Sequence, residues 1–151
     1  MSEPLFDSRT HRHDLPYLFA GQAQKEGFVN EAFARIDALL HMTIEGTASS
    51  PPDAAAEGEC WLIGSESAGT WSGHAGEIAA LAGGNWLFFT PRDGMRVLNR
   101  STGQEQRFAG DWSAPDRPAA PTGGTTVDVE ARAALVAVID CLTASGILPA
   151  S

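Results

Sequence analysis

Positive charge is the property that this sequence has least of. Lys25 is its only lysine, and ten basic residues stand against nineteen acidic ones, which gives a formal net charge of -9. A surface of this sign repels both a phosphate backbone and an anionic membrane. We therefore expect neither nucleic acid nor a membrane surface among the partners of this protein.

Long hydrophobic runs are also missing. The first thirty residues carry charges and histidines throughout, so we expect no secretory signal peptide. No stretch approaches the roughly 20 apolar residues that cross a bilayer as a helix. The sequence thus predicts a protein that is made in the cytoplasm and does not insert into a membrane.

Cysteine is scarce, with Cys60 and Cys141 far apart in the chain. Without a signal peptide, two free, buried thiols are favoured over a disulfide, and the spacing excludes the usual zinc arrangements. His11, His13 and Asp14 alternate as metal ligands could, but no further ligand lies at a useful spacing. A solvated polar arm is the favoured interpretation, and we expect neither metal nor cofactor.

The length of 151 residues fits one domain with appended arms. Apolar periodicity and the positions of proline and glycine predict an α+β fold, in which a small Trp-rich antiparallel β unit is flanked by two helices. The expected segments are an N-terminal arm (1–27), a helix packing on the core (28–45), a Pro/Ala loop (46–58), the Trp-rich β unit (59–112), a flexible linker (113–125) and the C-terminal helix (126–151).

The first helix has a clear start signal, because Asn30 is a good N-cap residue. Its larger apolar residues fall at three- and four-residue spacing, which predicts one buried stripe. These residues are Phe33, Ile36, Leu39 and Leu40.

Short runs rich in β-branched and aromatic residues follow the Pro/Ala loop, separated by Gly, Asp, Asn and Ser. This pattern is typical of a meander of antiparallel strands joined by tight turns. The expected strands are Glu59–Ile63, Thr70–Ser72, Glu77–Leu81, Asn85–Thr90, Arg96–Asn99 and Glu105–Phe108.

Four tryptophans fall within the β unit. We expect Trp61 and Trp86 to fill its core, since each ring buries a large area. Trp71 lies in a Gly-rich stretch with His74, and we expect it to show a face to solvent. An exposed indole near glycines is a platform for stacking a sugar or for anchoring a protein, so Trp71 and His74 are the candidate contacts for a glycan or a protein.

Catalytic patterns are weak by comparison. Ser65 and Ser67 lack the strand-to-helix spacing of a nucleophile, and their stretch reads as a hairpin turn. The acids of the β unit, Glu59, Glu77 and Asp93, form no evident pair for glycosidic cleavage. No Gly-Gly stretch precedes the lysine of a phosphate-binding loop. We therefore expect no catalytic residues.

The C-terminal helix is predicted from Val129 to about Ala144, capped by Asp128 and ended by Gly146. It is one-sided and follows a linker, so it is barely stable alone and needs a partner surface. Its stripe, together with two aromatic residues of the arm, forms our candidate assembly contacts. These residues are Leu135, Val138, Ile139, Leu142, Tyr17 and Phe19.

Several motifs between residues 14 and 112 occur in a characteristic order. They are Leu15-Pro16-Tyr17, Gln22-Ala23-Gln24-Lys25, Asn30-Glu31-Ala32, Asp37, Pro51-Pro52, Trp61, Gly69-Thr70-Trp71-Ser72-Gly73, Ile78-Ala79, Trp86-Leu87-Phe88 and Pro91-Arg92-Asp93-Gly94. In the order and spacing of these motifs, the chain resembles an uncharacterised domain family of fibre and spike proteins from prophages and gene transfer agents of alphaproteobacteria.

The resemblance implies a particle component with no catalytic residues to carry over, and the shortness of the chain favours a base or adaptor over a long fibre. We therefore expect a homo-oligomeric, trimeric or pentameric head-spike base or short spike on the particle surface. It would contact capsid or spike proteins and support attachment to host polysaccharide. A carbohydrate-binding tail-fibre module and a glycan hydrolase are the alternatives.

Overall fold

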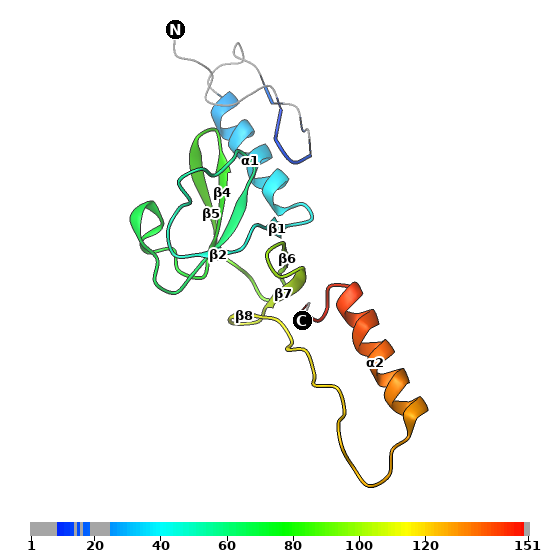
Figure 1. Ribbon diagram of the computed structural model, residues 1–151. Helices are drawn as coiled ribbons and strands as arrows, with labels where there is room; N and C mark the ends of the chain where they lie inside the picture. Colours follow the sequence, from blue (N-terminus) through cyan, green and yellow to red (C-terminus); the bar gives the residue numbers. More distant parts are fainter. Residues whose placement is uncertain (1–8, 14, 16, 19–24, 150–151) are drawn as a thin grey trace. The chain divides into compact units, whose positions relative to one another are not determined.

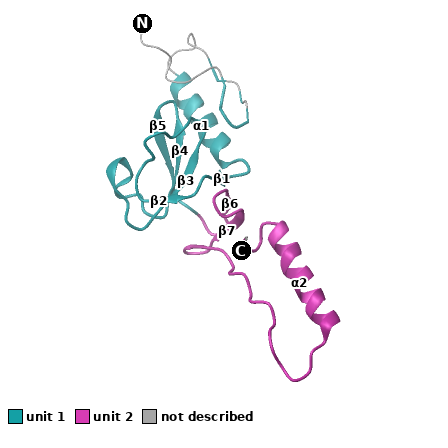
Figure 2. Cartoon of the chain, in the orientation of Figure 1, with its two compact units in different colours: residues 1–91 teal, residues 92–151 magenta. Residues whose placement is uncertain are grey.

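The computed structural model describes residues 9–13, 15, 17, 18 and 25–149. Within them the chain has an α+β fold of two α-helices and eight strands (Figure 1), which confirms the predicted class. It forms two compact units, Met1–Pro91 and Arg92–Ser151 (Figure 2). The boundary falls inside the stretch 59–112, which the sequence predicted as a single β unit.

Unit 1 is built on one sheet with the strand order β2-β3-β4-β5. The strands are β2 (Thr47–Ala48), β3 (Cys60–Ile63), β4 (Ile78–Ala82) and β5 (Asn85–Phe89), and a further short strand, β1 (Thr43–Ile44), precedes them. Strands β3, β4 and β5 pair antiparallel as predicted. Strand β2, which lies in the stretch 46–58 before the predicted β unit, joins the same sheet by pairing with β3 in parallel.

The hairpin of β4 and β5 closes through Gly83 and Gly84, both with positive φ (59° and 72°), which suits a two-residue turn. The carboxylate of Glu57 accepts hydrogen bonds from both backbone N–H groups, at 2.8 and 2.6 Å. The predicted Pro/Ala loop, residues 46–58, therefore contains strand β2 and also Glu57, whose side chain holds the hairpin turn.

Helix α1 (Glu26–Leu39) covers one face of this sheet, as Figure 1 shows. Arg35 fixes it there, since its guanidinium donates to the carbonyl of Phe88 (3.2 Å) and lies 5.4 Å from the ring centroid of Phe89. The same face of the sheet is apolar and buried. Its buried residues are Cys60, Leu62, Ile78, Ala80 and Phe89.

The orientation of α1 reverses our prediction. Its buried residues are small or polar: Asn30, Ala34, Asp37 and Ala38. Ile36, Leu39 and Leu40 of the predicted buried stripe are exposed instead, and Phe33 is half-buried. Asn30 is also not the N-cap, because α1 begins earlier at Glu26 and the side chain of Asn30 is used elsewhere.

Asn30 and Asp37 hold the N-terminal arm against α1. The side-chain amide of Asn30 bonds both backbone groups of Leu18, accepting from its N–H (2.9 Å) and donating to its carbonyl (3.1 Å). The carboxylate of Asp37 accepts from Thr10 Oγ1 (2.7 Å) and from two backbone N–H groups, those of Arg12 (2.9 Å) and His13 (2.7 Å). The polar side of the helix is therefore a binding surface for the arm.

Arg12 completes this attachment at the end of α1. Its guanidinium donates to the carbonyls of Asp37 (3.3 Å), Ala38 (2.6 Å) and His41 (3.0 Å). The last carbonyls of a helix have no intrahelical partner and favour a positive charge. Arg12 thus acts as a C-terminal cap that is supplied from the arm.

Unit 2 contains the antiparallel strands β6 (Arg96–Asn99), β7 (Gln104–Phe108) and β8 (Trp112–Ser113), followed by helix α2 (Val129–Ala144). The buried amide of Gln104 donates to the carbonyls of Pro115 (2.7 Å) and Ile147 (3.0 Å). Strand β7 therefore holds both the start of the linker and the residues after α2.

Helix α2 has the predicted ends. Asp128 caps it by accepting from the N–H of Ala131 (2.8 Å), and Gly146 follows it with a φ of 75°. The N–H of Ile147 bonds back to the carbonyl of Leu142 (3.0 Å), as expected for a left-handed helix end. Neither helix of the described residues is long and apolar enough to cross a bilayer.

Candidate functional site

The sheet face opposite α1 carries three tryptophans of unit 1 together with Phe88. The strand register aligns Trp61, Ala79 and Phe88 in one row across β3, β4 and β5, and Trp86 lies two residues before Phe88 on the same side. The indole of Trp71 packs against this row, where the small side chain of Ala79 leaves room. We call this group, Trp61, Trp71, Trp86, Phe88 and His74, the aromatic face.

Trp71 is the centre of the aromatic face and is not its exposed member. Its exposed fraction is 0%, and its ring meets that of Trp86 edge-on at a centroid distance of 5.0 Å. Our expectation that Trp71 shows a face to solvent was wrong. The expected strand Thr70–Ser72 is instead a short 3-10 helix, Gly69–Trp71, which turns the indole inward.

Trp61 and Trp86 were predicted as core, yet both remain half-buried at the edge of the cluster. Trp61 donates its indole N–H to Glu59 (3.2 Å). Any platform for a ligand on the aromatic face is therefore formed by Trp61 and Trp86, with Trp71 as their support.

His74 lies flat on Phe88, with ring centroids 3.7 Å apart and an interplanar angle of 5°. Its Nδ1 donates to Glu77 (2.8 Å), whose other oxygen accepts from Thr90 Oγ1 (2.7 Å). The imidazole is thus fixed in plane and tautomer while its side chain stays 36% exposed. Of the two residues that the sequence predicted as contacts for a glycan or a protein, His74 is exposed on the aromatic face and Trp71 is not.

Glu77 is held in its ionised form. Burial alone would raise its pKa, but the hydrogen bonds from Thr90 and His74 and the charge of His74 together lower the pKa below its ordinary value of 4.5. A general acid for glycosidic cleavage requires the opposite shift. The other two candidate acids serve local structure, since Glu59 accepts from Trp61 and Asp93 accepts from the N–H of Gly110 (2.9 Å).

His13 takes part in the attachment of the arm to α1. His13 donates its backbone N–H to Asp37, and its Nε2 lies 3.0 Å from the carbonyl oxygen of Leu40. Among the described residues, no group of three or more His, Cys, Asp or Glu side chains is arranged to hold a metal ion. Asp14, the third ligand that the sequence suggested, lies outside the described residues.

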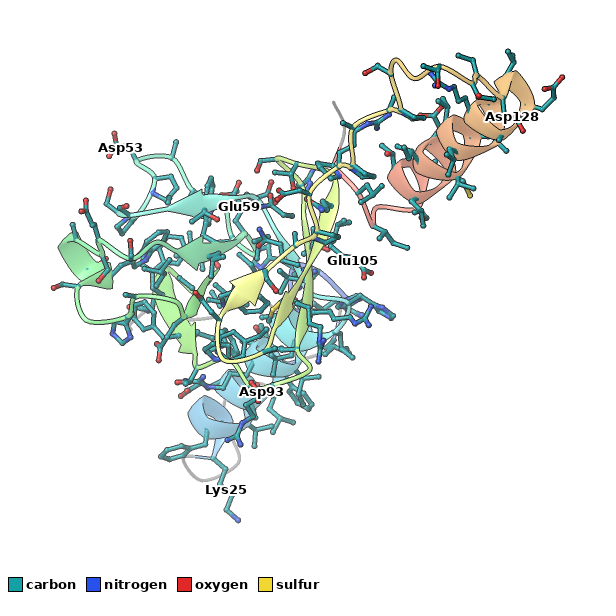
Figure 3. The ribbon with its side chains drawn as sticks, turned by 90° about the horizontal axis from the view of Figure 1, so that it is seen from below. Lys25, Asp53, Glu59, Asp93, Glu105 and Asp128 are labelled. Carbon is teal, nitrogen blue, oxygen red and sulfur yellow. The ribbon has the colours of Figure 1, made fainter. Side chains whose placement is uncertain are left out.

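Helix α2 presents the second candidate surface. None of its sixteen residues, all of which are described, is buried. Leu135 and Val138 are 52% and 55% exposed, while Ile139 and Leu142 are half-buried. Figure 3 shows side chains projecting around the helix, which begins after Asp128. The apolar stripe of α2 that we predicted as an assembly contact is therefore largely exposed to solvent in a single copy.

Tyr17 of the arm does not share this exposure. Tyr17 is buried in unit 1, where burial first, and then the charges of Asp37 and Glu57, raise its pKa. Tyr17 lines a small pocket between arm, helix and sheet together with Arg12 and Asp37, so its role as an assembly contact was a wrong expectation. Phe19, its predicted companion, lies outside the described residues.

The two cysteines are free, as predicted, but only one is buried. Cys60 lies in β3 under α1, and burial raises the pKa of its thiol to about 11. Cys141 is exposed on α2, so the expectation that both thiols are buried was wrong.

Sequence reasoning missed the arm-binding residues Asn30 and Asp37. A signal for them exists, because Asn30, Ala34, Asp37 and Ala38 follow the same i, i+4, i+7, i+8 spacing that marks a buried helix face. We read only large apolar residues as that face. Two polar residues within a stripe of alanines indicate a face that binds another backbone.

A family model described as "Protein of unknown function (DUF2793)" matches residues 29–113, more than half of the 151 residues. The matched region runs from α1 to the end of β8 and therefore includes the aromatic face, whereas α2 lies beyond it. Among curated proteins, none matches the chain.

Proposed function

We propose that this chain, which belongs to the DUF2793 family of proteins of unknown function, is a non-enzymatic structural subunit of a phage-like particle. Copies of the subunit would assemble through α2. The observation that carries the proposal is the exposure of α2, an apolar helix none of whose residues is buried. Each Leu or Val side chain that becomes fully buried in an assembly would contribute about 1.5–3 kcal/mol.

Two features support assembly through this helix. Its charged residues are only Glu130, Arg132 and Asp140, so most of its circumference is apolar. A helix that is hydrophobic on nearly every side is normally buried. Unit 2 holds α2 at its C-terminal end, where the backbone N–H of Glu105 donates to the carbonyl of Gly146 (2.8 Å). Most of its length is left accessible to other copies.

The placement on a phage-like particle rests on the resemblance of residues 14 to 112 to fibre and spike proteins of prophages and gene transfer agents. We place the chain in the base or adaptor of a head spike, as a closed trimer or pentamer, because most homo-oligomers have closed symmetry. Such a subunit would contact capsid or spike proteins and support attachment to host polysaccharide.

The test combines mass in solution with particle composition. We expect the chain to be an oligomer by light scattering, and Leu135→Glu to raise its dissociation constant at least about tenfold by placing a charge in the apolar contact. Val127→Glu, at an exposed site just before the helix, is the matched control and should leave the mass unchanged. A monomer that is missing from purified particles would sink the proposal.

A second candidate role, glycan binding, is favoured by the aromatic face. Trp61 and Trp86 are half-exposed on the face where Glu77 orients the imidazole of His74 against Phe88, and aromatic rings beside polar groups suit a sugar. Trp61→Ala and His74→Ala should each weaken binding of capsular polysaccharide while the far-UV circular dichroism stays that of the wild type. Unchanged binding in both variants would exclude this role.

A further inference from the structure

The aromatic face is built from a part of the chain that has no lysine or arginine. Residues 36–91 contain neither, but they contain seven Asp or Glu residues. Strands β2 to β5 all lie in this stretch. Unit 1 carries -8 of the formal charge of -9, because residues 1–91 hold four basic and twelve acidic residues. The charge of the whole chain is therefore concentrated in the unit that presents the aromatic face.

The basic residues of unit 1 belong to the arm or to α1. They are Arg9, Arg12, Lys25 and Arg35. Arg35 pairs with Glu31 at 2.9 Å, and Figure 3 shows Lys25 at the end of α1 that is remote from Glu59. Among the described residues, neither Lys nor Arg forms an ion pair with Glu59 or Glu77, the two carboxylates beside the aromatic face. An acidic sugar placed there would meet only negative charge.

Glu59 is the carboxylate that a ligand can reach. Both oxygens of Glu77 already accept hydrogen bonds within the protein. One oxygen of Glu59 accepts from the indole N–H of Trp61 (3.2 Å), and no described residue donates to the other. The carbonyl of Glu59 accepts from the N–H of Leu81 (2.9 Å), and Leu81 pairs with Trp86. Glu59 therefore lies beside Trp61 along β3 and in the same cross-strand row as Trp86.

These groups together select for a donor-rich, cationic ligand. The face of an indole attracts a cation within about 6 Å of the ring centroid, and Trp is the strongest of the aromatic side chains in this respect. The adjacent carboxylate of Glu59 adds a charged acceptor. A neutral His74, whose Nδ1–H is donated to Glu77, offers Nε2 as one more acceptor. A sugar ring with an ammonium substituent can stack on an indole and donate to Glu59 at the same time.

We propose that the aromatic face binds glycans that carry unacetylated amino groups. Glu59 accepts hydrogen bonds from the ammonium, while Trp61 and Trp86 provide the surface on which the sugar rings stack. This inference rests on the glycan-binding role proposed above and adds the charge class of the sugar. Glycans rich in carboxylate or sulfate groups are excluded by the same carboxylates.

Calorimetric titration of the full chain with two matched ligands tests the inference. They are oligomers of glucosamine and of N-acetylglucosamine of equal length, with the amines of the first protonated. We expect the glucosamine oligomer to bind at least about fivefold more tightly, since it adds a cation–π contact and an ion pair. Glu59→Gln should reduce this preference below about twofold. Glu66→Gln, which removes the same charge from an exposed loop residue of unit 1, is the control and should keep the preference.

A preference that Glu66→Gln lowers as much as Glu59→Gln would overturn the inference, because the attraction would then come from the general negative charge. Equal binding of the two oligomers would overturn it as well. If neither oligomer binds while capsular polysaccharide does, the charge class is wrong and the glycan-binding role stands. If the polysaccharide also fails to bind, both are wrong. Thermal unfolding of Glu59→Gln checks that a loss of preference is not a loss of fold.

Discussion

Removing the indole of Trp71 should destabilise unit 1 strongly, although the residue lies in a Gly-rich stretch between two strands. The side chain is fully buried and contacts Ile63, Ala79 and Trp86. Truncating a buried Trp to Ala typically costs about 3–5 kcal/mol. For a unit of this size each kcal/mol lowers the melting temperature by about 4–8 °C, so Trp71→Ala should melt at least about 12 °C lower.

One feature moderates the cost and supplies a second variant. The indole N–H of Trp71 is buried without a hydrogen-bond acceptor among the described residues, and such burial costs about 1–3 kcal/mol. Trp71→Phe removes this N–H while keeping an aromatic ring against Trp86. It should therefore lose less than half of the stability that Trp71→Ala loses.

Urea and thermal unfolding followed by far-UV circular dichroism would measure both variants. Phe28→Ala is the control, because a change at this exposed aromatic residue should stay within about 0.5 kcal/mol in dilute solution. If Trp71→Ala lost less than 1 kcal/mol, or no more than Phe28→Ala, the assignment of Trp71 as the core of the aromatic face would be refuted.

Three further predictions concern thiol chemistry, the arm and acid stability. A thiol reagent at pH 8 should modify Cys141 rapidly and Cys60 only after unfolding, so rapid reaction of two thiols in the native chain would contradict the burial of Cys60. Asp37→Asn should speed tryptic cleavage at Arg12 several-fold, because an amide cannot accept hydrogen bonds from all three donors of the arm. Cleavage at the wild-type rate would argue against the attachment of the arm through Asp37. Because the pKa of Glu77 is lowered in the folded state, its ionised carboxylate stabilises the fold above pH 4.5. In urea unfolding, the free energy of unfolding of the wild type should therefore exceed that of Glu77→Gln by less and less as the pH falls below 4.5. A difference in free energy that does not change with pH would exclude this contribution of Glu77.

The elements that the sequence predicted well are those with local signals. Strands β3, β4 and β5 follow short apolar runs separated by turn residues, and the Gly83-Gly84 turn has the backbone conformation that its composition demands. Helix α2 carries its own cap at Asp128 and its own stop at Gly146. Such features depend on a few neighbouring residues and need no knowledge of the tertiary contacts.

The features that the sequence did not reveal depend on distant partners. Trp71 is buried because Ala79, eight residues later, leaves room for it across the sheet. The parallel pairing of β2 joins Thr47 to Leu62, and no local pattern encodes such a pair. Helix α1 turns its polar side inward because the arm supplies hydrogen-bond donors for Asp37. Hydrophobic periodicity alone therefore chose the wrong face.

The hydrogen bonds between Asn30 and Leu18 have a consequence for how freely this chain can vary. Among the described residues, the side chain of Asn30 hydrogen-bonds to the backbone N–H and carbonyl of Leu18, groups that almost every amino acid provides. In a library that replaces every position with all twenty amino acids, position 18 should accept most substitutions. Position 30 should accept almost none, because few other side chains offer one donor and one acceptor at that reach.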